Sequence, residues 1–291
     1  MPSLKEIRAR INSVASTEKI TNAMKMVSAA KLKKSEGLTL NFMPYRNKLS
    51  ETLSNYLGSL EETVAIPLAN QREVRHVTLI AFASSNGLCG VYNANIIKLF
   101  KKTYDDYVQQ LGKENVDVIL FGKKVIEYAE RSGISVAQAH ESLSNHLSFD
   151  LAVELSNVLM KRFIDRQTDR VVAIYNHHKN AGVQYPMMET LLPIAASRRD
   201  ALPVPFNYIV EPSKEEFINA LVPKVIHTIF YAAMLDAMTA EHGARMTAML
   251  IASDNAATLL QELRRDYNRA RQNVITSELI DIVGGAEALQ S

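Results

Sequence analysis

The sequence predicts an α/β protein made of a long antiparallel coiled coil and a globular domain with a mostly parallel sheet. Three observations predict it. Apolar residues recur every three or four positions in both terminal segments, and strand and helix patterns alternate between them. We therefore expect three parts: an N-terminal coiled-coil helix over residues 1–60, a globular α/β domain over 61–212, and a C-terminal coiled-coil helix over 213–291.

The N-terminal segment reads as one long amphipathic helix. Ser3 is a suitable N-cap, and Glu6 three residues later completes a capping box. One stripe of the helix carries Leu4, Ile7, Ile11, Val14, Ile20, Met24, Val27, Leu38, Phe42, Tyr45, Leu49, Leu53, Tyr56 and Leu60. The step from Val14 to Ile20 breaks a strict heptad, so we expect a helix pair without leucine-zipper regularity.

The C-terminal segment begins in the same way, with Ser213 and Glu216, and we expect Gly284 and Gly285 to end it. At ~1.5 Å per residue, this helix spans roughly 105 Å and the N-terminal helix roughly 85 Å. The longer helix should therefore continue alone from about Ala270. Because that end is rich in apolar residues, we expect another chain to surround it. In this register, residues near Val14 face residues near Ala257.

The middle segment predicts a Rossmann-like domain. Strand patterns occupy residues 74–83, 116–121, 170–175, 183–192 and 206–210, and helix patterns occupy 93–110, 123–131 and 149–164. Alternating strands and helices favour a parallel sheet covered on both faces. No helix separates the last strands, so part of the sheet should be antiparallel.

Composition restricts the classes of protein. The net charge is only +2, but residues 1–60 carry ten Lys or Arg against four Glu, and residues 214–291 carry seven against ten acidic residues. A basic helix beside an acidic one supports their pairing. A single cysteine, Cys89, excludes an internal disulfide. No stretch approaches eighteen uninterrupted apolar residues, so we expect a soluble chain that reaches a membrane only through partners.

Four features could carry chemistry. The turn Ser84–Gly90 follows a strand, where doubly wound folds bind phosphate, but its spacing matches neither common nucleotide motif, so a structural turn is favoured. The pair His177-His178 makes a poor metal site and is expected in a surface loop. Cys89 is expected to be a buried thiol rather than a nucleophile. The arginines at 264, 265, 269 and 271 resemble a nucleic-acid patch, but Glu262 and Asp266 interrupt it.

Several segments resemble the gamma subunit of F-type ATP synthases, and together they span the chain. They are residues 4–11 (LKEIRARI), 17–27 (TEKITNAMKMV), 87–90 (GLCG), 241–246 (EHGARM), 253–256 (SDNA), 267–272 (YNRARQ) and 275–279 (ITSEL). The sequence departs from the family pattern at Ser85-Asn86 and at Asn273.

The resemblance implies a non-catalytic rotor shaft, with no catalytic residue, cofactor or metal of its own. It couples ion flow through a membrane ring of c subunits to ATP synthesis or hydrolysis in a hexamer of alpha and beta subunits, and it also binds the epsilon subunit. The family would place Arg271, Gln272, Met24, Lys25 and Thr276 against the catalytic beta subunits, with Leu88 and Cys89 as further subunit contacts. No nucleic acid is implied, and the chain would be peripheral to the cytoplasmic face of a bacterial cell membrane.

Two alternatives rest on the residues alone. The first is a coiled-coil adaptor with a Rossmann-like interaction domain. The second is a nucleotide-dependent enzyme that uses the Gly87 turn, which the lack of an acid, base or metal constellation disfavours.

Overall fold

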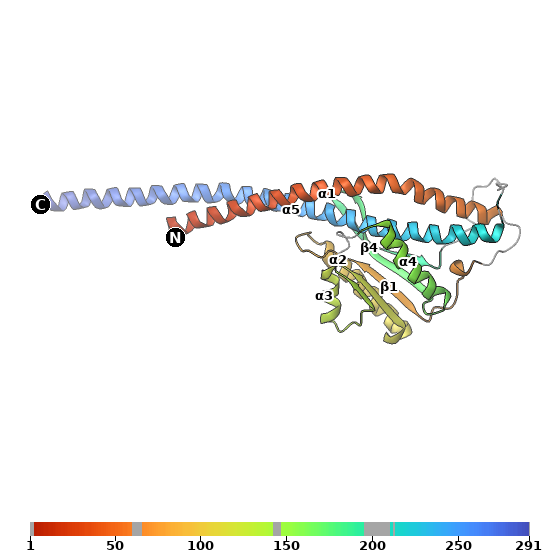
Figure 1. Ribbon diagram of the computed structural model, residues 1–291. Coiled ribbons are helices and arrows are strands. Elements are labelled where there is room, and N and C mark those ends of the chain that lie inside the picture. The colour runs from red at the N-terminus through yellow and green to blue at the C-terminus, as the bar shows by residue number, and fades with distance from the viewer. Residues whose placement is uncertain (1–2, 60–65, 142–146, 195–209, 212, 291) are drawn as a thin grey trace. The chain divides into compact units, whose positions relative to one another are not determined.

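The computed structural model describes residues 3–59, 66–141, 147–194, 210–211 and 213–290 (Figure 1). The chain divides into two compact units. We call Met1–Ser28 with Met246–Ser291 the helix-pair unit, and Ala29–Arg245 the sheet unit. The two longest helices, α1 (Leu4–Ser59) and α5 (Lys214–Gln290), each contribute to both units. The division of the sequence at residues 60 and 212 stays a prediction.

The sheet unit contains a five-stranded sheet in the order β3-β2-β1-β4-β5. Its strands are β1 (Val77–Phe82), β2 (Val116–Phe121), β3 (Gln138–His140), β4 (Arg170–Asn180) and β5 (Val183–Leu192). β1 pairs in parallel with β2 and β4, and β2 pairs in parallel with β3. β4 and β5 form an antiparallel hairpin, so the prediction of a mostly parallel sheet with an antiparallel part is confirmed.

Several details of the sheet differ from the sequence prediction. β1 begins at Val77 rather than at residue 74, and β4 continues to Asn180 instead of ending at Tyr175. β3 was not predicted, because three residues are too few to show an alternating pattern. The strand predicted over 206–210 lies almost wholly outside the described residues, and Val210 is not in a strand.

Successive side chains of a strand point to opposite faces of the sheet. Helices cover both of these faces. One face packs against α2 (Tyr92–Leu111) and α3 (Lys123–Arg131) through Val77, Leu79 and Ala81 of β1. The other face carries Ile80 and Phe82 of β1 and packs against α4 (Phe149–Ile164), α1 and α5. The short 3-10 helices η1 (Pro67–Ala69) and η2 (Lys113–Asn115) complete the unit.

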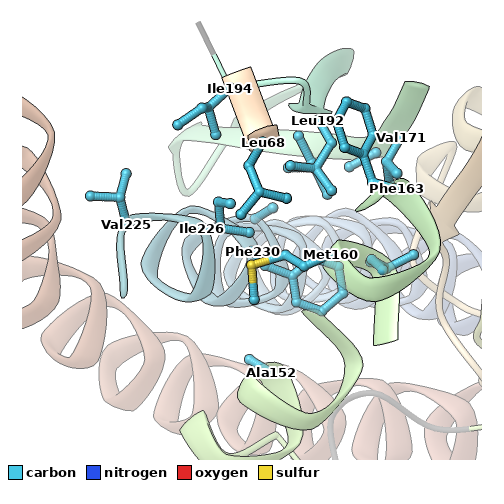
Figure 2. Close-up of a cluster of buried hydrophobic side chains, with 14 of the residues drawn as sticks. Leu68, Ala152, Met160, Phe163, Val171, Leu192, Ile194, Val225, Ile226 and Phe230 are labelled. Carbon is cyan, nitrogen blue, oxygen red and sulfur yellow. The ribbon is translucent and has the colours of Figure 1, made fainter. Parts of the chain in front are cut away.

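The α4 face holds the larger apolar core (Figure 2). Figure 2 shows Met160 of α4 beside Phe230 of α5, and Phe163 of α4 beside Val171 of β4 and Leu192 of β5. Phe163 is fully buried, and Phe230 is 1 % exposed. The first turns of α5 are therefore part of the core of the sheet unit.

Both long helices begin as predicted. The backbone N–H of Glu6 donates to Ser3 Oγ at 3.3 Å, and Ser3 N–H donates to the Glu6 carboxylate at 2.9 Å, which is a complete capping box. Ser213 Oγ accepts from the backbone N–H of Glu216 at 3.2 Å. The predicted end of α5 at Gly284 is wrong, because the helix continues through both glycines to Gln290. Glycine costs about 1 kcal/mol in a helix interior but does not oblige the helix to end.

In the helix-pair unit, α1 and α5 run antiparallel. Thr21 Oγ1 of α1 and Ser253 Oγ of α5 lie 2.9 Å apart in a hydrogen bond. Continuing this register places Val14 opposite residue 260, within a turn of the predicted partner Ala257. Within the sheet unit the helices are also antiparallel, with Phe42 against Tyr231 and Tyr56 against Phe217.

Among the described residues, α5 is the one helix long and apolar enough to cross a membrane by length and composition. However, 67 % of its most apolar window is buried inside the protein. Burial against the sheet and α1 accounts for this composition without a bilayer.

Candidate functional site

The first part of the candidate site is the turn that follows β1. The backbone N–H of Ser84 donates to Asn93 Oδ1 at 2.9 Å, and Ser84 Oγ donates to the carbonyl of Asn86 at 2.8 Å. Leu88 and Gly90 both have a backbone φ near +60°. Left-handed backbone is uncommon for a residue such as leucine. The surrounding bonds hold Leu88 in this conformation, with its side chain 64 % exposed.

A helix of the same unit closes over this turn. Arg245 of α5 donates from Nη2 to Ser84 Oγ at 2.8 Å and to the carbonyl of Asn86 at 3.3 Å. Its Nη1 forms an ion pair with Glu241 Oε1 at 2.7 Å, one helical turn earlier. The two side chains are 11 % and 8 % exposed, so each buried charge depends on the other.

A small apolar cluster lies beside the ion pair and fixes the turn further. Cys89 and Tyr92 pack against Ala240 and Ala244 of α5. The Tyr92 hydroxyl donates to the carbonyl of Ala237 at 2.9 Å. Burial raises the pKa of the Cys89 thiol, against the opposing effect of the Arg245 charge. The prediction that Cys89 is a buried thiol is confirmed, since its side chain is 2 % exposed.

The sequence favours a structural role for the turn after β1, and its place in the sheet bears on that prediction. In a doubly wound sheet, ligands bind at the carboxyl ends of the strands where the strand order reverses, which here is between β1 and β4. The turn after β1 lies at that end. Its polar groups are bound to Arg245 and Asn93 of the chain itself. The backbone N–H and the hydroxyl of Ser84 are therefore already hydrogen-bonded within the chain.

The histidine pair does not lie in a surface loop, so that prediction is wrong. His177 and His178 are in β4, because the strand continues five residues past Tyr175. His177 Nδ1 lies 2.5 Å from Asp236 Oδ2 of α5, and His178 Nε2 lies 3.1 Å from Glu36 Oε1 of α1. Each histidine thus binds a carboxylate of a different helix. The described residues contain no group of three side chains able to hold a metal ion.

The second part of the candidate site is the end of α5 in the helix-pair unit. Ala270 is half-buried, but every described side chain from Arg271 to Val283 is exposed, including Gln272 and Thr276. The exposed large apolar residues of this end are Val274, Ile275, Leu279, Ile280, Ile282 and Val283. The expectation that α5 outruns α1 from about residue 270 is confirmed.

On α1, the other two predicted partner contacts lie in the same unit. Met24 and Lys25 are half-buried, and their neighbours Ile20, Met26 and Val27 are more than half exposed. The arginines at 264, 265, 269 and 271 are all exposed on α5. The structure thus presents apolar and basic side chains along this helix pair.

Sequence reasoning missed the contact between Arg245 and the turn after β1. Glu241 and Arg245 have the i, i+4 spacing of a helical ion pair, which was the available signal. That spacing usually indicates a solvated helix face. Only the burial of both residues shows that the pair faces the turn.

Comparison with known proteins agrees with this architecture. A family model described as ATP synthase matches residues 3–289. The ATP synthase gamma chain of Bacteroides fragilis is 43 % identical over 292 residues, which cover 99 % of this chain and 100 % of that protein. The gamma chain of Flavobacterium johnsoniae is 44 % identical and covers 99 % of each chain.

Solved structures share the fold. A chain of the Euglena gracilis mitochondrial ATP synthase has a TM-score of 0.64 at 18 % identity, covering 98 % of this chain and 94 % of its own. A chain of the Tetrahymena thermophila mitochondrial ATP synthase, from its central stalk and c-ring, has a TM-score of 0.59 at 24 % identity and covers 80 % of this chain and 99 % of its own. With full-length relatives above 40 % identity, this chain belongs to the ATP synthase gamma chain family.

Proposed function

We propose that this gamma chain turns as the central shaft of an F-type ATP synthase and couples ion flow to ATP synthesis or hydrolysis. It is a non-catalytic subunit that works with other subunits of the complex. The exposed end of α5 is the observation that carries the proposal. From Arg271 to Val283 every side chain of this helix is exposed, yet the segment is rich in large apolar side chains. Such a surface is stable in water only when another protein covers it.

A hexamer of alpha and beta subunits is the partner that fits this end of α5. The exposed residues 271–283 rise roughly 20 Å along the helix, at about 1.5 Å per residue. A single helix can be enclosed on all sides only by a ring or a channel. The side chains of Arg271, Gln272 and Thr276 then contact the beta subunits. Met24 and Lys25, on α1 of the helix-pair unit, contact them as well.

The shaft acts by changing conformational equilibria in sites it does not form. A helix pair presents different side chains on its different sides, such as apolar Met26 and Val27 beside basic Lys25. Each beta subunit therefore meets a different surface at each angle. A partner can shift the equilibrium between the open and closed states of a site only if it binds the two states with different affinities. An asymmetric shaft supplies that difference in affinity.

The sheet unit is the natural place for the partners that turn the shaft. Its larger apolar core includes the first turns of α5, so torque applied to the unit passes directly into that helix. We assign the contacts with the epsilon subunit and the membrane ring of c subunits to the sheet unit. The related Tetrahymena chain comes from a structure described as a central stalk with a c-ring, which supports the assignment.

In this proposal the chain is peripheral to the membrane, at the cytoplasmic face of a bacterial cell membrane. It then takes part in ATP synthesis and ion transport by the complex as a whole. Relatives such as the Bacteroides fragilis gamma chain support a bacterial setting.

Assembly and rotation test the proposal together. The purified chain should co-migrate with an alpha-beta hexamer of a related bacterium in a ratio of one chain to one hexamer. A bead attached through Lys101→Cys, on the exposed side of α2, should then rotate in one direction when ATP is added. Association without rotation would favour the coiled-coil adaptor, and no association at all would refute the shaft.

A further inference from the structure

The sheet unit contains a cavity that the shaft function does not use. It lies between α1, the β4–β5 hairpin and α5, and its volume is about 500 Å³. That size is within the range of sites for small organic molecules, which is about 300–1,000 Å³. The question is which chemical class of ligand its walls would bind.

One part of the wall is apolar and flexible. Leu40 and Met43 come from α1, Met187 comes from β5, and Leu235 comes from α5. Leu40 is 74 % exposed, which is high for a leucine on a helix packed against a sheet. Methionine side chains adapt to ligands of varied shape. These four residues would cover an aliphatic or aromatic body of moderate size.

The charged residues of the wall are mostly anionic. It carries the carboxylates Glu36, Glu189 and Asp236, and Arg46 is the one permanent cation among the residues that line the cavity. Counting only these carboxylates and Arg46, the formal charge is −2. Such a wall favours a cation and disfavours an anion.

The hydrogen bonds show which carboxylates hold the excess charge. Glu189 is neutralised, because Arg46 Nη2 binds it at 3.0 Å and the Tyr175 hydroxyl donates to it at 2.7 Å. Glu36 has the His178 ring as its partner, and Asp236 has the His177 ring and the backbone N–H of His178. Among the described residues, neither carboxylate forms an ion pair with a lysine or an arginine, so both retain the capacity to bind an ammonium group.

We propose that this cavity binds small amphipathic amines, with the ammonium group at Glu36 and Asp236 and the apolar body against Leu40, Met43, Met187 and Leu235. A pocket with an apolar wall and a few convergent polar groups is the usual form of a small-molecule site. The carboxylates orient the cation, and the methionines accept the body. Because the walls come from α1, the sheet and α5, such a ligand contacts all three at once.

Three probes with one body and different head groups test the charge preference on the full-length chain. They are 4-phenylbutylamine, 4-phenylbutan-1-ol and 4-phenylbutanoate, followed by ligand-observed NMR and calorimetry. The amine should bind with a Kd of about 1 mM, as expected for a fragment of this size. The alcohol should bind at least about tenfold more weakly, and the acid should show no binding, since the wall repels it.

Variants of the chain then test whether the amine binds in this cavity. Glu36→Gln and Asp236→Asn should each weaken amine binding about fivefold, the effect of losing one partly exposed charge contact. Glu51→Gln, on an exposed part of α1 outside the cavity, is the matched control and should leave it unchanged. Leu40→Arg should weaken the amine by placing a cation at the cavity, whereas Leu38→Arg should not, because Leu38 does not line it.

Equal binding of the amine and the alcohol would overturn the proposal. So would unchanged amine affinity in Glu36→Gln, which is the deciding variant if Asp236→Asn fails to fold, because the Glu36 side chain is 41 % exposed. These results do not depend on rotation or assembly, so they separate this proposal from the shaft function.

Discussion

The guanidinium of Arg245 and the hydroxyl of Ser84 form a hydrogen bond of 2.8 Å between residues 161 positions apart. This contact joins α5 to the turn after β1. The same arginine neutralises the buried carboxylate of Glu241, so the turn, the helix and the ion pair depend on one another. A location that binds phosphate in other doubly wound folds serves here to attach the sheet to the long helix.

We first predict that Arg245→Ala destabilises the chain by about 3 kcal/mol, because removing one partner of a buried ion pair leaves the other charge uncompensated. Urea unfolding followed by circular dichroism measures the change. The control is Arg131→Ala, whose side chain is 79 % exposed and whose ion pair at 3.8 Å is loose, so it should cost at most ~0.5 kcal/mol. If the two variants unfold alike, Arg245 does not hold the turn.

Second, the purified chain should neither bind nor hydrolyse ATP. The polar groups of Ser84 are already bound to Asn93 and Arg245, and Val91 and Tyr92 follow Gly90 where a phosphate loop would carry lysine. Titration calorimetry with Mg-ATP should show no heat of binding. A Kd in the micromolar range would contradict this interpretation of the turn.

Third, Asp169 should make stability depend on pH in the acid range. Burial opposes its charge, but the backbone N–H groups of Arg75 and His76 and the guanidinium of Arg72 outweigh burial and hold the pKa of this carboxyl below its usual value. Arg75 N and His76 N both donate to Asp169 Oδ2 at 2.9 Å. The stabilisation is therefore present above the unfolded pKa of about 3.9 and is lost as pH falls through the lower folded pKa.

Asp169→Asn tests this directly. The variant should lower the free energy of unfolding by about 2 kcal/mol at pH 7, because an amide oxygen cannot satisfy all these donors. The difference from the unchanged chain should shrink toward pH 3. Asp165→Asn is the control, since Asp165 is exposed, and it should show no such trend. A difference that is the same at pH 3 and pH 7 would exclude the carboxylate charge as the cause.

Fourth, Thr21→Cys with Ser253→Cys should form a disulfide under mild oxidation. Their side-chain oxygens lie 2.9 Å apart, which is compatible with the ~3.8 Å between Cβ atoms that a disulfide needs. Thr17→Cys with Ser253→Cys lies one helical turn out of register and should cross-link slowly. Cys89 is buried and should not compete. Gel mobility without reductant reports the bond, and faster reaction of the out-of-register pair would contradict the helix register.

Much of this fold follows from periodic patterns in the sequence. The boundaries of α3 and α4 were predicted to the residue, because each helix has strong apolar periodicity and follows a turn or capping residue. The antiparallel helix pair follows from two periodic terminal segments of opposite charge, and the unaccompanied end of α5 follows from the helix lengths. Length is a property that the sequence carries directly.

The failures share a cause, which is that they depend on contacts between distant residues. Nothing near His177 shows that β4 will pair with β5 past Tyr175, or that Asp236 and Glu36 will bind the two rings. Gly284 and Gly285 suggested an end because glycine is common there, but their local cost is too small to stop a helix. The contact of Arg245 with Ser84 likewise needed the structure, because a helical i, i+4 pair does not reveal what it faces.

The last prediction concerns Arg271 and Gln272, at the point where α5 continues without α1. Both side chains are exposed in the free chain. In the proposed shaft they contact a loop of a beta subunit. Arginine offers a rigid set of donors suited to a carboxylate, and glutamine both donates and accepts. Replacing both by alanine should lower the coupled ATP turnover of the assembled complex severalfold, because the variant loses this contact. In the proposed shaft the contact forms in only one orientation of the rotor.

The same double variant should leave the isolated chain nearly unchanged, within the ~0.5 kcal/mol typical of surface substitutions. Thermal unfolding of the free chain and ATP turnover of the complex are therefore measured on one protein. Arg131→Ala, on α3 of the sheet unit, is the matched control because it also removes an exposed arginine. It should change neither the thermal stability of the free chain nor the ATP turnover of the complex. An arginine that only stabilised the helix would give the reverse pattern, with lower stability and normal turnover. Normal coupled turnover in the double variant would exclude these two residues as the contact that transmits rotation.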